Sequence, residues 1–391
     1  MRRIVYATGS RADYGIVRRY LALLGNDPGV DLSLWVTGAL LDGRYGHQVD
    51  LIREDGFRIG AEIPLPLDTS SDRSVLHAMA RALDGFSRCI DEKRPDLLIV
   101  LGDRYEILPA ALAAAMQRVP VLHLHGGEAT YANYDEFIRH SITKMARWHF
   151  TATEEYRRRV IQLGEDPSRV FCLGALGAEN CLGIDEGSVR PDVGALPRRG
   201  YFVVLFHPET ISGADPADQA REVLAAASRF PGVRFVFLGS NADSHADEVR
   251  RLVRERADED ASSLYFENLR TNDYHWLVRN SIALVGNSSS GLIEAPSLGV
   301  RTVNIGHRQD GRVRGGSVID VECRADEIEA AMRAAMDEPD ASRWPNPYFR
   351  PGAAKAYCAK TLEIISLLPV EGAKEFYDVD FDVDGQGALG A

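Results

Sequence analysis

The stretch DLLIVLGDRYEILPAALAAAMQRVPVLHLHGGE, residues 96–128, contains the pattern on which the fold prediction rests. An apolar run at 97–101 and a second one at 119–124 each lead into glycine and polar residues. Between them, PAALAAAMQR has a helical pattern, and Pro109 indicates where that helix starts. Apolar strands separated by a helix are typical of a parallel sheet that is covered on both faces.

The same alternation extends from this stretch in both directions. Further apolar runs occur at 3–9, 32–38, 148–154, 169–175, 201–209, 233–241, 263–269, 282–291 and 301–306. The segment GIDEGSVRPDVGALPRRG, 183–200, breaks the pattern and is rich in Gly, Pro and charge, as expected of an interdomain linker. We therefore predict an α/β protein with two Rossmann-like, doubly wound parallel-sheet domains, 1–185 and 196–350, and a cleft between them.

Length and composition limit the possible functions. The 391 residues favour two domains, and the net charge of −12 argues against a nucleic-acid surface. No apolar run is long enough to span a bilayer, and the five scattered cysteines indicate reduced thiols. We expect a cytoplasmic protein without a membrane or nucleic-acid partner, a metal site or a cofactor. Its acidic tail, 371–391, is expected to be partly disordered.

Two segments have the pattern of a phosphate-binding site. VGNSSSGLIEAPSLG, 285–299, leads from a strand through Gly286 and Ser288–Ser290 toward a helix, where hydroxyl and N–H groups can hold a diphosphate. Glu294 is expected about a turn and a half into that helix, in reach of a ribose diol. TGSRADYG, 8–15, offers Arg11 at a second helix start, although Ser10 there is equally well explained as an N-cap.

Further basic groups follow strands of the second predicted domain. His207, in FHPETIS, can reach a ligand phosphate across the cleft or can simply end its strand in a His-Pro turn. Arg308, Arg312 and Arg314, in IGHRQDGRVRGGS, can offset diphosphate charge or can solvate a loop.

Titratable side chains gather after two strands of the first predicted domain. Asp103, in LGDRYE, lies directly beyond a buried strand, with a helix N-cap as the alternative. In HLHGGE, 123–128, a Gly-Gly turn brings His125 and Glu128 together, whereas His123 between leucines is expected to be structural. Charged residues at helical spacing follow: Asp135, Glu136, Arg139 and His140. A salt-bridged helix face explains each residue alone, but the cluster beside the Gly-Gly turn favours an acid/base site.

A diphosphate cradle and an acid/base cluster together suit an enzyme that acts on the sugar of a nucleotide sugar. The segments concerned are TGSRADYGIVRR, LGDRYE, HGGE, NYDEFIRHSITK, RVIQLGEDPSRVF, FHPET, GNSSSGLIEAPS and NIGHRQDGR. Through them, in order and to about residue 350, the chain resembles the hydrolysing UDP-N-acetylglucosamine 2-epimerases, most closely their bacterial NeuC type, which starts sialic acid biosynthesis. The resemblance implies a GT-B-like fold in which the helix at 351–370 completes the first domain.

The resemblance also implies a reaction and its residues. UDP-N-acetylglucosamine would lose UDP from C1 and a proton from C2, and water would add to the 2-acetamidoglucal to give N-acetylmannosamine. Asp103 and Asp135 match acid/base residues of the family, with Arg139 as their partner and Glu136 as the alternative to Asp135. The positions that match contacts to UDP are Arg11, Arg104, His207, Ser288, Ser289, Glu294 and Arg308.

One departure and two alternatives remain open. His125 stands where several relatives carry Glu, so the proton role of that Glu passes to His125 or Glu128. The same chemistry would serve UDP-2,4-diacetamido-2,4,6-trideoxyglucose in the legionaminic acid pathway. A GT-B glycosyltransferase is a further alternative, although it would need no clustered carboxylates. The UDP-sugar is thus the expected partner, and the resemblance suggests a homodimer or homotetramer through the first domain.

Overall fold

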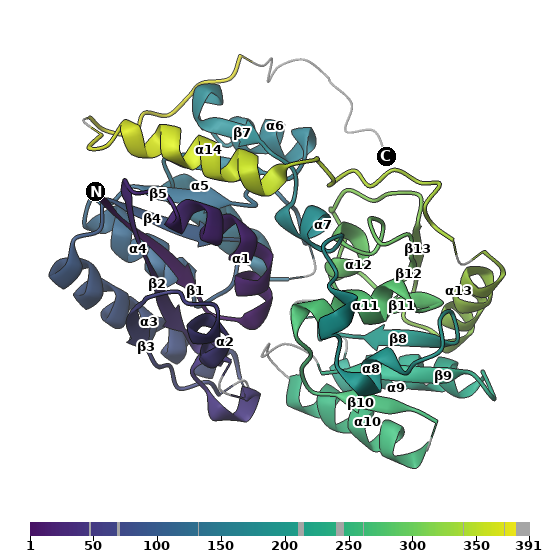
Figure 1. The fold of residues 1–391 in the computed structure, drawn as a ribbon. Coiled ribbons are helices and arrows are strands. Elements are labelled where there is room, and N and C mark those ends of the chain that lie inside the picture. Colours follow the sequence, from purple (N-terminus) through teal and green to yellow (C-terminus); the bar gives the residue numbers. More distant parts are fainter. Residues whose placement is uncertain are drawn as a thin grey trace.

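The computed structural model describes residues 1–46, 48–68, 71–131, 133–209, 215–239, 246–260, 262–338, 340–370 and 372–380. Figure 1 shows two lobes, each built on one parallel sheet, which confirms the predicted α/β fold with two Rossmann-like domains. Domain boundaries at 185 and 196 stay a prediction. Within the described ranges, no helix is long and apolar enough to cross a bilayer.

The first sheet has seven strands in the order β3-β2-β1-β4-β5-β6-β7. They are β1 (Arg2–Thr8), β2 (Val30–Thr37), β3 (Ile59–Ile63), β4 (Leu97–Leu101), β5 (Val121–Leu124), β6 (Trp148–Thr151) and β7 (Val170–Cys172). In β1, Ile4 and Tyr6 belong to one buried core and Val5 and Ala7 to another, so both faces of the sheet are covered. The strand order reverses between β1 and β4, and loops diverge there.

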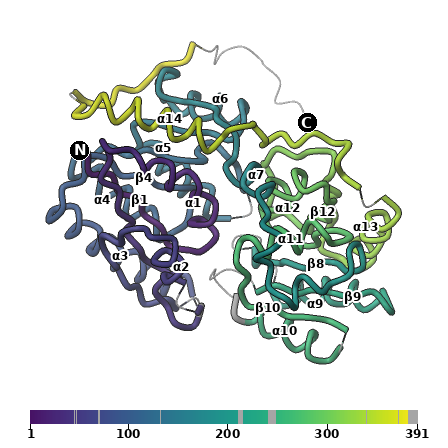
Figure 2. Tube along the Cα trace, in the orientation of Figure 1, coloured from purple at the N-terminus to yellow at the C-terminus, as the bar shows by residue number. Residues whose placement is uncertain are grey.

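Helices cover both faces of this sheet. Those on one face are α1 (Arg11–Gly25), α2 (Val49–Glu54) and α14 (Ala353–Ser366); those on the other are α3 (Asp72–Lys93), α4 (Leu108–Met116) and α5 (Asp135–Met145). Two more, α6 (Glu154–Gln162) and α7 (Leu176–Asn180), follow β6 and β7. Figure 2 shows α14 arriving from the second lobe and lying along the first, where it packs against α1.

The second sheet has six strands in the order β10-β9-β8-β11-β12-β13, with its reversal between β8 and β11. They are β8 (Tyr201–Leu205), β9 (Arg234–Leu238), β10 (Leu264–Phe266), β11 (Ala283–Gly286), β12 (Arg301–Ile305) and β13 (Val318–Val321). Its helices are α9 (Pro216–Ser228), α10 (Ala246–Glu259) and α13 (Ala325–Asp337) on one face, and α8 (Pro191–Gly194) and α11 (Thr271–Arg279) on the other. The short helix α12 (Ser290–Ile293) follows β11.

One edge strand in each sheet was missed by the sequence pattern. β3, IGAEI, is mostly half-exposed, and β13, VIDV, turns Asp320 to solvent. An edge strand has a strand neighbour on one side only, so it can form without a continuous apolar run. The other strands lie where the apolar runs predicted them.

A buried hydrogen-bond network joins the lobes on the side of α14. The hydroxyl oxygens of Tyr156, in α6, and Tyr348, just before α14, are 2.7 Å apart. Tyr348 also donates to the carbonyl of Val313 at 2.8 Å, and the N–H of Val313 donates to Tyr156 at 2.9 Å. Of the predicted tail, 372–380 is described and lies partly against the first lobe, while 381–391 lies outside the described residues.

Candidate active site

Two adjoining cavities open between the lobes, beyond the carboxyl ends of the strands. The serine cavity is lined by α1, α11 and the loops after β8, β10 and β11. The carboxylate cavity is lined by the loops after β1, β4, β5 and β12. Residues common to both walls are Ala12, Ile16, Gly177, Ser289, Ser290 and Glu294. One ligand can therefore extend from one cavity into the other, at the two points where the strand order reverses.

The predicted serine loop lines the serine cavity. The Oγ atoms of Ser288 and Ser290 are 2.9 Å apart, and Ser290 also contacts the hydroxyl of Tyr274. Asn287 fixes this loop to the end of β8, because its Oδ1 accepts from the N–H of His207 at 2.7 Å and its Nδ2 donates to the His207 carbonyl at 2.9 Å. The three serines and His207 consequently line the same cavity.

Two details of this loop add to the sequence prediction. Gly286 lies outside both described cavity walls, and a Cβ there would be 2.0 Å from the carbonyl oxygen of Leu205. Glycine is needed there for the close approach of the chain after β8, and a role of Gly286 in ligand binding stays a prediction. Helix α12 is only one turn long, so Glu294 is its C-cap residue and does not lie a turn and a half into the helix. Oε2 of Glu294 lies 3.1 Å from Nε2 of His275.

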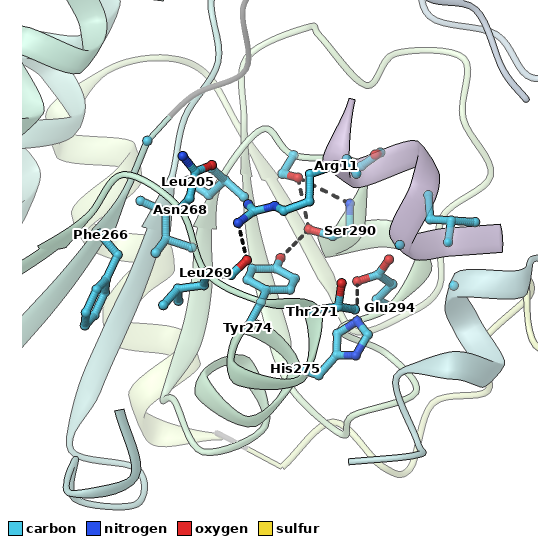
Figure 3. Close-up of a pocket in the computed structure, with 18 of the residues that line it drawn as sticks. Arg11, Leu205, Phe266, Asn268, Leu269, Thr271, Tyr274, His275, Ser290 and Glu294 are labelled. Carbon is cyan, nitrogen blue, oxygen red and sulfur yellow. Dashed lines mark hydrogen bonds and ion pairs between the residues drawn. The ribbon is translucent and has the colours of Figure 1, made fainter. Parts of the chain in front are cut away.

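Arg11 reaches from the start of α1 toward the second lobe, as Figure 3 shows. Its Nη1 donates to the carbonyl of Leu269. Burial lowers the pKa of the guanidinium to about 10, so it stays cationic at neutral pH. Ser10 caps α1, since its Oγ accepts from the N–H of Asp13 at 3.3 Å and Asp13 accepts from the Ser10 N–H at 2.8 Å. The N-cap interpretation of Ser10 is therefore confirmed, and phosphate binding by Arg11 stays a prediction.

The sequence pattern missed the outer wall of the serine cavity. The residues concerned are Phe266, Asn268, Leu269, Thr271, Tyr274 and His275 (Figure 3). They combine an aromatic ring and apolar surface with amide, hydroxyl and imidazole groups, which suits a planar polar base. The available signal was the Tyr-His pair within the helical pattern TNDYHWLV, 271–278, but such a pair is common in structural helices.

Arg139 organises the carboxylate cavity from behind Asp103. The fully buried guanidinium donates from Nε to Asp103 Oδ2 at 2.9 Å and from Nη1 to Glu136 Oε2 at 3.0 Å. Asp103 lines the cavity, whereas Glu136 lies behind it and pairs with His140 at 3.0 Å. Burial alone would raise the pKa of Glu136, but the hydrogen bonds from His140 and the Thr130 N–H and the charge of Arg139 lower it to about 2.

His125 and Glu128 form a pair that is continued by Arg312 of the other lobe. Nδ1 of His125 is 3.2 Å from Glu128 Oε1, and Glu128 Oε2 is 2.8 Å from Nη2 of Arg312. Burial alone would raise the pKa of Glu128, but the charge of Arg312 and the bond from His125 lower it to about 2. With Nδ1–H donated to Glu128, Nε2 is the ring nitrogen that can act as an acceptor. This Nε2 is buried and has no hydrogen-bond partner among the described residues.

The turn that presents His125 requires two left-handed residues. His125 has φ +63° and Gly127 has φ +81°. A Cβ at Gly127 would lie 2.3 Å from the carbonyl oxygen of Tyr156, so only glycine fits there. A histidine in this backbone region is uncommon, and such residues cluster at functional sites.

Most other predicted residues also line the carboxylate cavity: Asp135, Arg104 and Arg308. The Nε of Arg104 donates to the buried Glu106 at 2.6 Å. Arg312 was expected near the diphosphate, but it pairs with Glu128 instead. Arg314 lies outside both described cavities and pairs with Asp310 and Asp320, consistent with the loop-solvating alternative.

His123 is structural, as predicted. Its Nε2 lies 2.8 Å from the carbonyl oxygen of Gly102, and its Nδ1 lies 3.2 Å from Oγ1 of Thr143. Burial lowers the pKa of His123 to about 3, so the ring is neutral. Nε2–H therefore donates to Gly102, and Nδ1 accepts from the Thr143 hydroxyl.

Comparison with known proteins gives consistent matches over nearly the whole chain. The family model described as UDP-N-acetylglucosamine 2-epimerase matches residues 22–363. The polysialic acid biosynthesis protein P7 of Escherichia coli is 45% identical over 97% of this chain and 98% of its own length. A UDP-N,N'-diacetylbacillosamine 2-epimerase (hydrolyzing) of Legionella pneumophila is 34% identical over 94% of this chain and 97% of its own. The crystal structure of UDP-GlcNAc 2-epimerase from Neisseria meningitidis bound to UDP-GlcNAc has a TM-score of 0.76 at 17% identity, covering 92% of this chain and 100% of that one.

Proposed function

Because this chain belongs to the UDP-N-acetylglucosamine 2-epimerase family, we propose that it is a hydrolysing 2-epimerase, converting UDP-N-acetylglucosamine and water to N-acetylmannosamine and UDP. The observation that carries this proposal is the junction of the two cavities. One contains Arg11 and is rich in hydroxyl groups, and the other contains a buried network of carboxylates, histidine and arginine. A nucleoside diphosphate suits the first, and C1 and C2 of its sugar then lie at the second.

UDP is assigned to the serine cavity. The diphosphate lies against Ser288–Ser290, with Arg11 and His207 beside it, because hydroxyl, N–H and cationic groups are good partners for phosphate oxygens. Glu294, held by His275, is positioned for the ribose diol. The uracil ring is assigned to the wall that contains Phe266. The Neisseria meningitidis enzyme, which has a similar fold, is bound to UDP-GlcNAc, and this supports a UDP-sugar as the ligand here.

The chemistry requires elimination followed by hydration. In the first step the C2–H bond breaks, its electron pair forms the C1=C2 double bond, and the C1–O bond breaks with its electrons leaving on UDP. In the second step a proton returns to C2 from the opposite face, water oxygen bonds to C1, and the water proton passes to a base. Positive charge develops at C1 as UDP departs, so a fixed carboxylate nearby stabilises both transition states.

Asp103 is the carboxylate that we assign to C1. It follows Gly102, the first residue after β4, and Arg139 and the partly buried surroundings fix its side chain. Its ion pair with Arg139 is suited to holding a constant charge.

His125 and Asp135 are assigned as the two proton carriers, one for each face of C2. Nε2 of His125 is a buried acceptor in the wall of the cavity, and Glu128 holds the ring through Nδ1. After Nε2 takes the C2 proton, the imidazolium is stabilised by the ionised Glu128. Asp135, at the start of α5, lines the same cavity from another element. Glu128 is assigned to holding His125, and Glu136 to holding Arg139. The low pKa values of both glutamates make them poor proton donors and acceptors at neutral pH.

The relatives support UDP-N-acetylglucosamine as the first choice of substrate. The name of the Escherichia coli relative concerns polysialic acid biosynthesis, which supports a place at the first step of sialic acid biosynthesis. The name of the Legionella relative keeps the 2,4-diacetamido sugar as the second candidate, at 34% identity against 45%. Both substrates need the same chemistry at C1 and C2.

A homodimer or homotetramer that forms through the first lobe is also part of the proposal. The outer surface of α3 and α4, which pack side by side, exposes Leu76, Leu83, Leu112 and Met116. Leu76 is 63% exposed and Met116 77%, so this apolar strip is suited to contact with a second copy. Light scattering of the protein, compared with a Leu76→Lys, Met116→Lys variant, tests this point.

A cytoplasmic location completes the proposal. All five cysteines are unpaired in the structure, and free thiols are typical of reducing compartments.

The test of the reaction is NMR of the purified protein with UDP-N-acetylglucosamine in D₂O. We expect UDP together with N-acetylmannosamine that carries deuterium at C2. N-acetylglucosamine without deuterium at C2 would instead favour the glycosyltransferase alternative. Turnover of only the 2,4-diacetamido sugar would keep the chemistry and change the substrate, and turnover of neither would contradict the proposal.

A further inference from the structure

The chain beyond α14 binds back onto the first lobe, as the yellow trace in Figure 1 shows. Residues 372–377 are termed the C-terminal latch. Lys374 is its main anchor, with Nζ 2.8 Å from the carbonyl oxygen of Lys144 and 2.6 Å from that of Ala146. These carbonyls end α5, where helical carbonyls lack partners within the helix and a cation is favourable. The latch therefore supplies the cap of α5 from more than 200 residues away.

A buried carboxylate holds the same lysine. Glu165, whose side chain is 2% exposed, has its Oε2 2.6 Å from Nζ of Lys374. The carboxylate is also 2.7 Å from Nζ of Lys144 and 3.0 Å from Nε2 of His149. Burying a carboxylate is unfavourable unless its partners are all in place. The position of Lys374 is thus specified by a buried carboxylate and helix-end carbonyls, not by a loose surface contact.

The rest of the latch is fitted to a glycine turn. The N–H of Tyr377 donates to the carbonyl of Gly164 at 3.0 Å, and a Cβ at Gly164 would lie 2.3 Å from the ring of Phe376. The same ring lies 4.8 Å from Nζ of Lys144. The latch and the first lobe consequently match in shape as well as in charge.

Helix α5 connects the latch to the catalytic cluster. Its first turns carry Arg139, the partner of Asp103, and its last turn carries Thr143. The Thr143 carbonyl accepts from Lys374 at 3.3 Å, while its hydroxyl binds His123. His123 in turn holds the carbonyl of Gly102, the residue before Asp103. Asp103 is therefore held by α5 in two ways. Arg139 of α5 bonds to it directly, and Thr143 of α5 holds the preceding residue, Gly102, through His123.

We propose that the C-terminal latch sets the geometry of the acid/base cluster, with Lys374 as a positioning residue that acts through α5, Thr143 and His123. This inference rests on the proposed function and deepens it. When Lys374 is removed, the end of α5 loses its cation and Glu165 keeps Lys144 but loses its second lysine, so Asp103 and Arg139 lose part of the support that aligns them. A misplacement of about 1 Å can lower the rate about 10²-fold. The serine loop belongs to the other lobe, so UDP binding is maintained.

The central test compares Lys374→Met, Lys374→Arg and the control Lys355→Met, which changes an exposed lysine of α14. We expect Lys374→Met to lower kcat about tenfold or more, with unchanged affinity for UDP in calorimetry. Lys374→Arg restores the charge and is expected to recover most of kcat. Hydrogen exchange of the 135–146 peptide, measured without substrate, is expected to rise in Lys374→Met only.

The outcomes separate this inference from the proposed function. No turnover by the wild-type protein would overturn the proposed function, while faster exchange in α5 of Lys374→Met would still support the latch. An unchanged kcat and unchanged exchange in Lys374→Met would overturn the latch. If Lys374→Met does not fold, Phe376→Ala and Thr143→Val replace it. Their effects on kcat are expected to be less than additive when combined, and full additivity would contradict a shared path through α5.

Discussion

The serine cavity and the carboxylate cavity hold their polar groups in different ways. Ser288 and Ser290 are neutral groups that bond to each other, and Ser290 also bonds to Tyr274, on a loop set by backbone geometry. The carboxylate cavity instead contains buried ions in matched pairs: Asp103 with Arg139, and Glu128 with Arg312. A hydroxyl group can exchange a hydroxyl partner for a phosphate oxygen at a small cost in free energy. Removing the partner of a buried ion costs much more free energy.

This difference separates binding from chemistry. Groups that change partners easily are suited to a ligand that must enter and leave as UDP. Groups that cannot move are suited to a preorganised field, which acts on charge that exists only in the transition state. Substitutions in the carboxylate cavity are therefore expected to change kcat, and substitutions in the serine cavity to change UDP affinity.

The largest effect is expected for Asp103→Asn. The amide keeps the size of the side chain but removes the charge opposite C1, which belongs to one of the carboxylates that pair with Arg139. We expect kcat to fall about 10³-fold, in the range found for fixed electrostatic groups. Calorimetry should give an unchanged affinity for UDP. The control is Asp84→Asn, on the exposed face of α3. Equal losses of kcat and UDP affinity in Asp103→Asn would contradict the assignment of chemistry and UDP binding to separate cavities.

A smaller loss is expected for His125→Gly. The backbone of His125 has φ +63°, which glycine adopts without strain, so the variant removes the imidazole and little else. We expect kcat to fall about 10²-fold, as for loss of a general base. Added imidazole should restore part of the turnover and of the deuterium incorporation at C2. Loss of kcat without rescue would favour Glu128 or Asp135 as the group that accepts the C2 proton.

Glu128→Gln tests the cost of breaking a buried pair. It leaves the buried Arg312 without its carboxylate, which should destabilise the protein by about 3 kcal/mol. The folded-state pKa of Glu128, about 2, is below its ordinary value of 4.5. The stabilisation is therefore present above about pH 4.5 and is lost as the pH falls toward 2. The unfolding temperatures of the wild-type protein and the Glu128→Gln variant should differ most above about pH 5 and converge as the pH falls toward 2.

The matched control is Glu255→Gln, which breaks an exposed pair with Arg251 in α10. Its cost should be about 0.5 kcal/mol or less, because exposed ion pairs contribute little. Equal destabilisation by the two variants would show that the Glu128–Arg312 pair is not held as a buried ion pair.

The same contrast explains which parts of the site were predictable from sequence. Ser288–Ser290 lie in one short loop after a strand, so their pattern alone indicated a phosphate-binding site. The partners of Asp103 and Glu128 are 36 and 184 residues away, and no local pattern specifies which arginine meets which carboxylate. The inner strands were predictable for the same reason, because each is a continuous apolar run in the local sequence. Edge strands β3 and β13, and His275 in the wall of the serine cavity, depend on tertiary neighbours that local patterns do not contain.

Ser289→Ala gives the smallest expected effect on kcat and tests the other side of the comparison. Ser289 lies on the wall common to both cavities, and its hydroxyl is assigned to the diphosphate. A hydrogen bond to a charged group contributes about 1.5–3 kcal/mol, so UDP affinity measured by calorimetry should fall by about tenfold to about 150-fold. The loss of kcat at saturating substrate should be much smaller, and Ser228→Ala, on α9, should change neither quantity. A fall in kcat with unchanged UDP affinity would mean that the serine loop acts on the reacting bond. The diphosphate would then have to lie deeper, toward Arg308 and the carboxylate cavity.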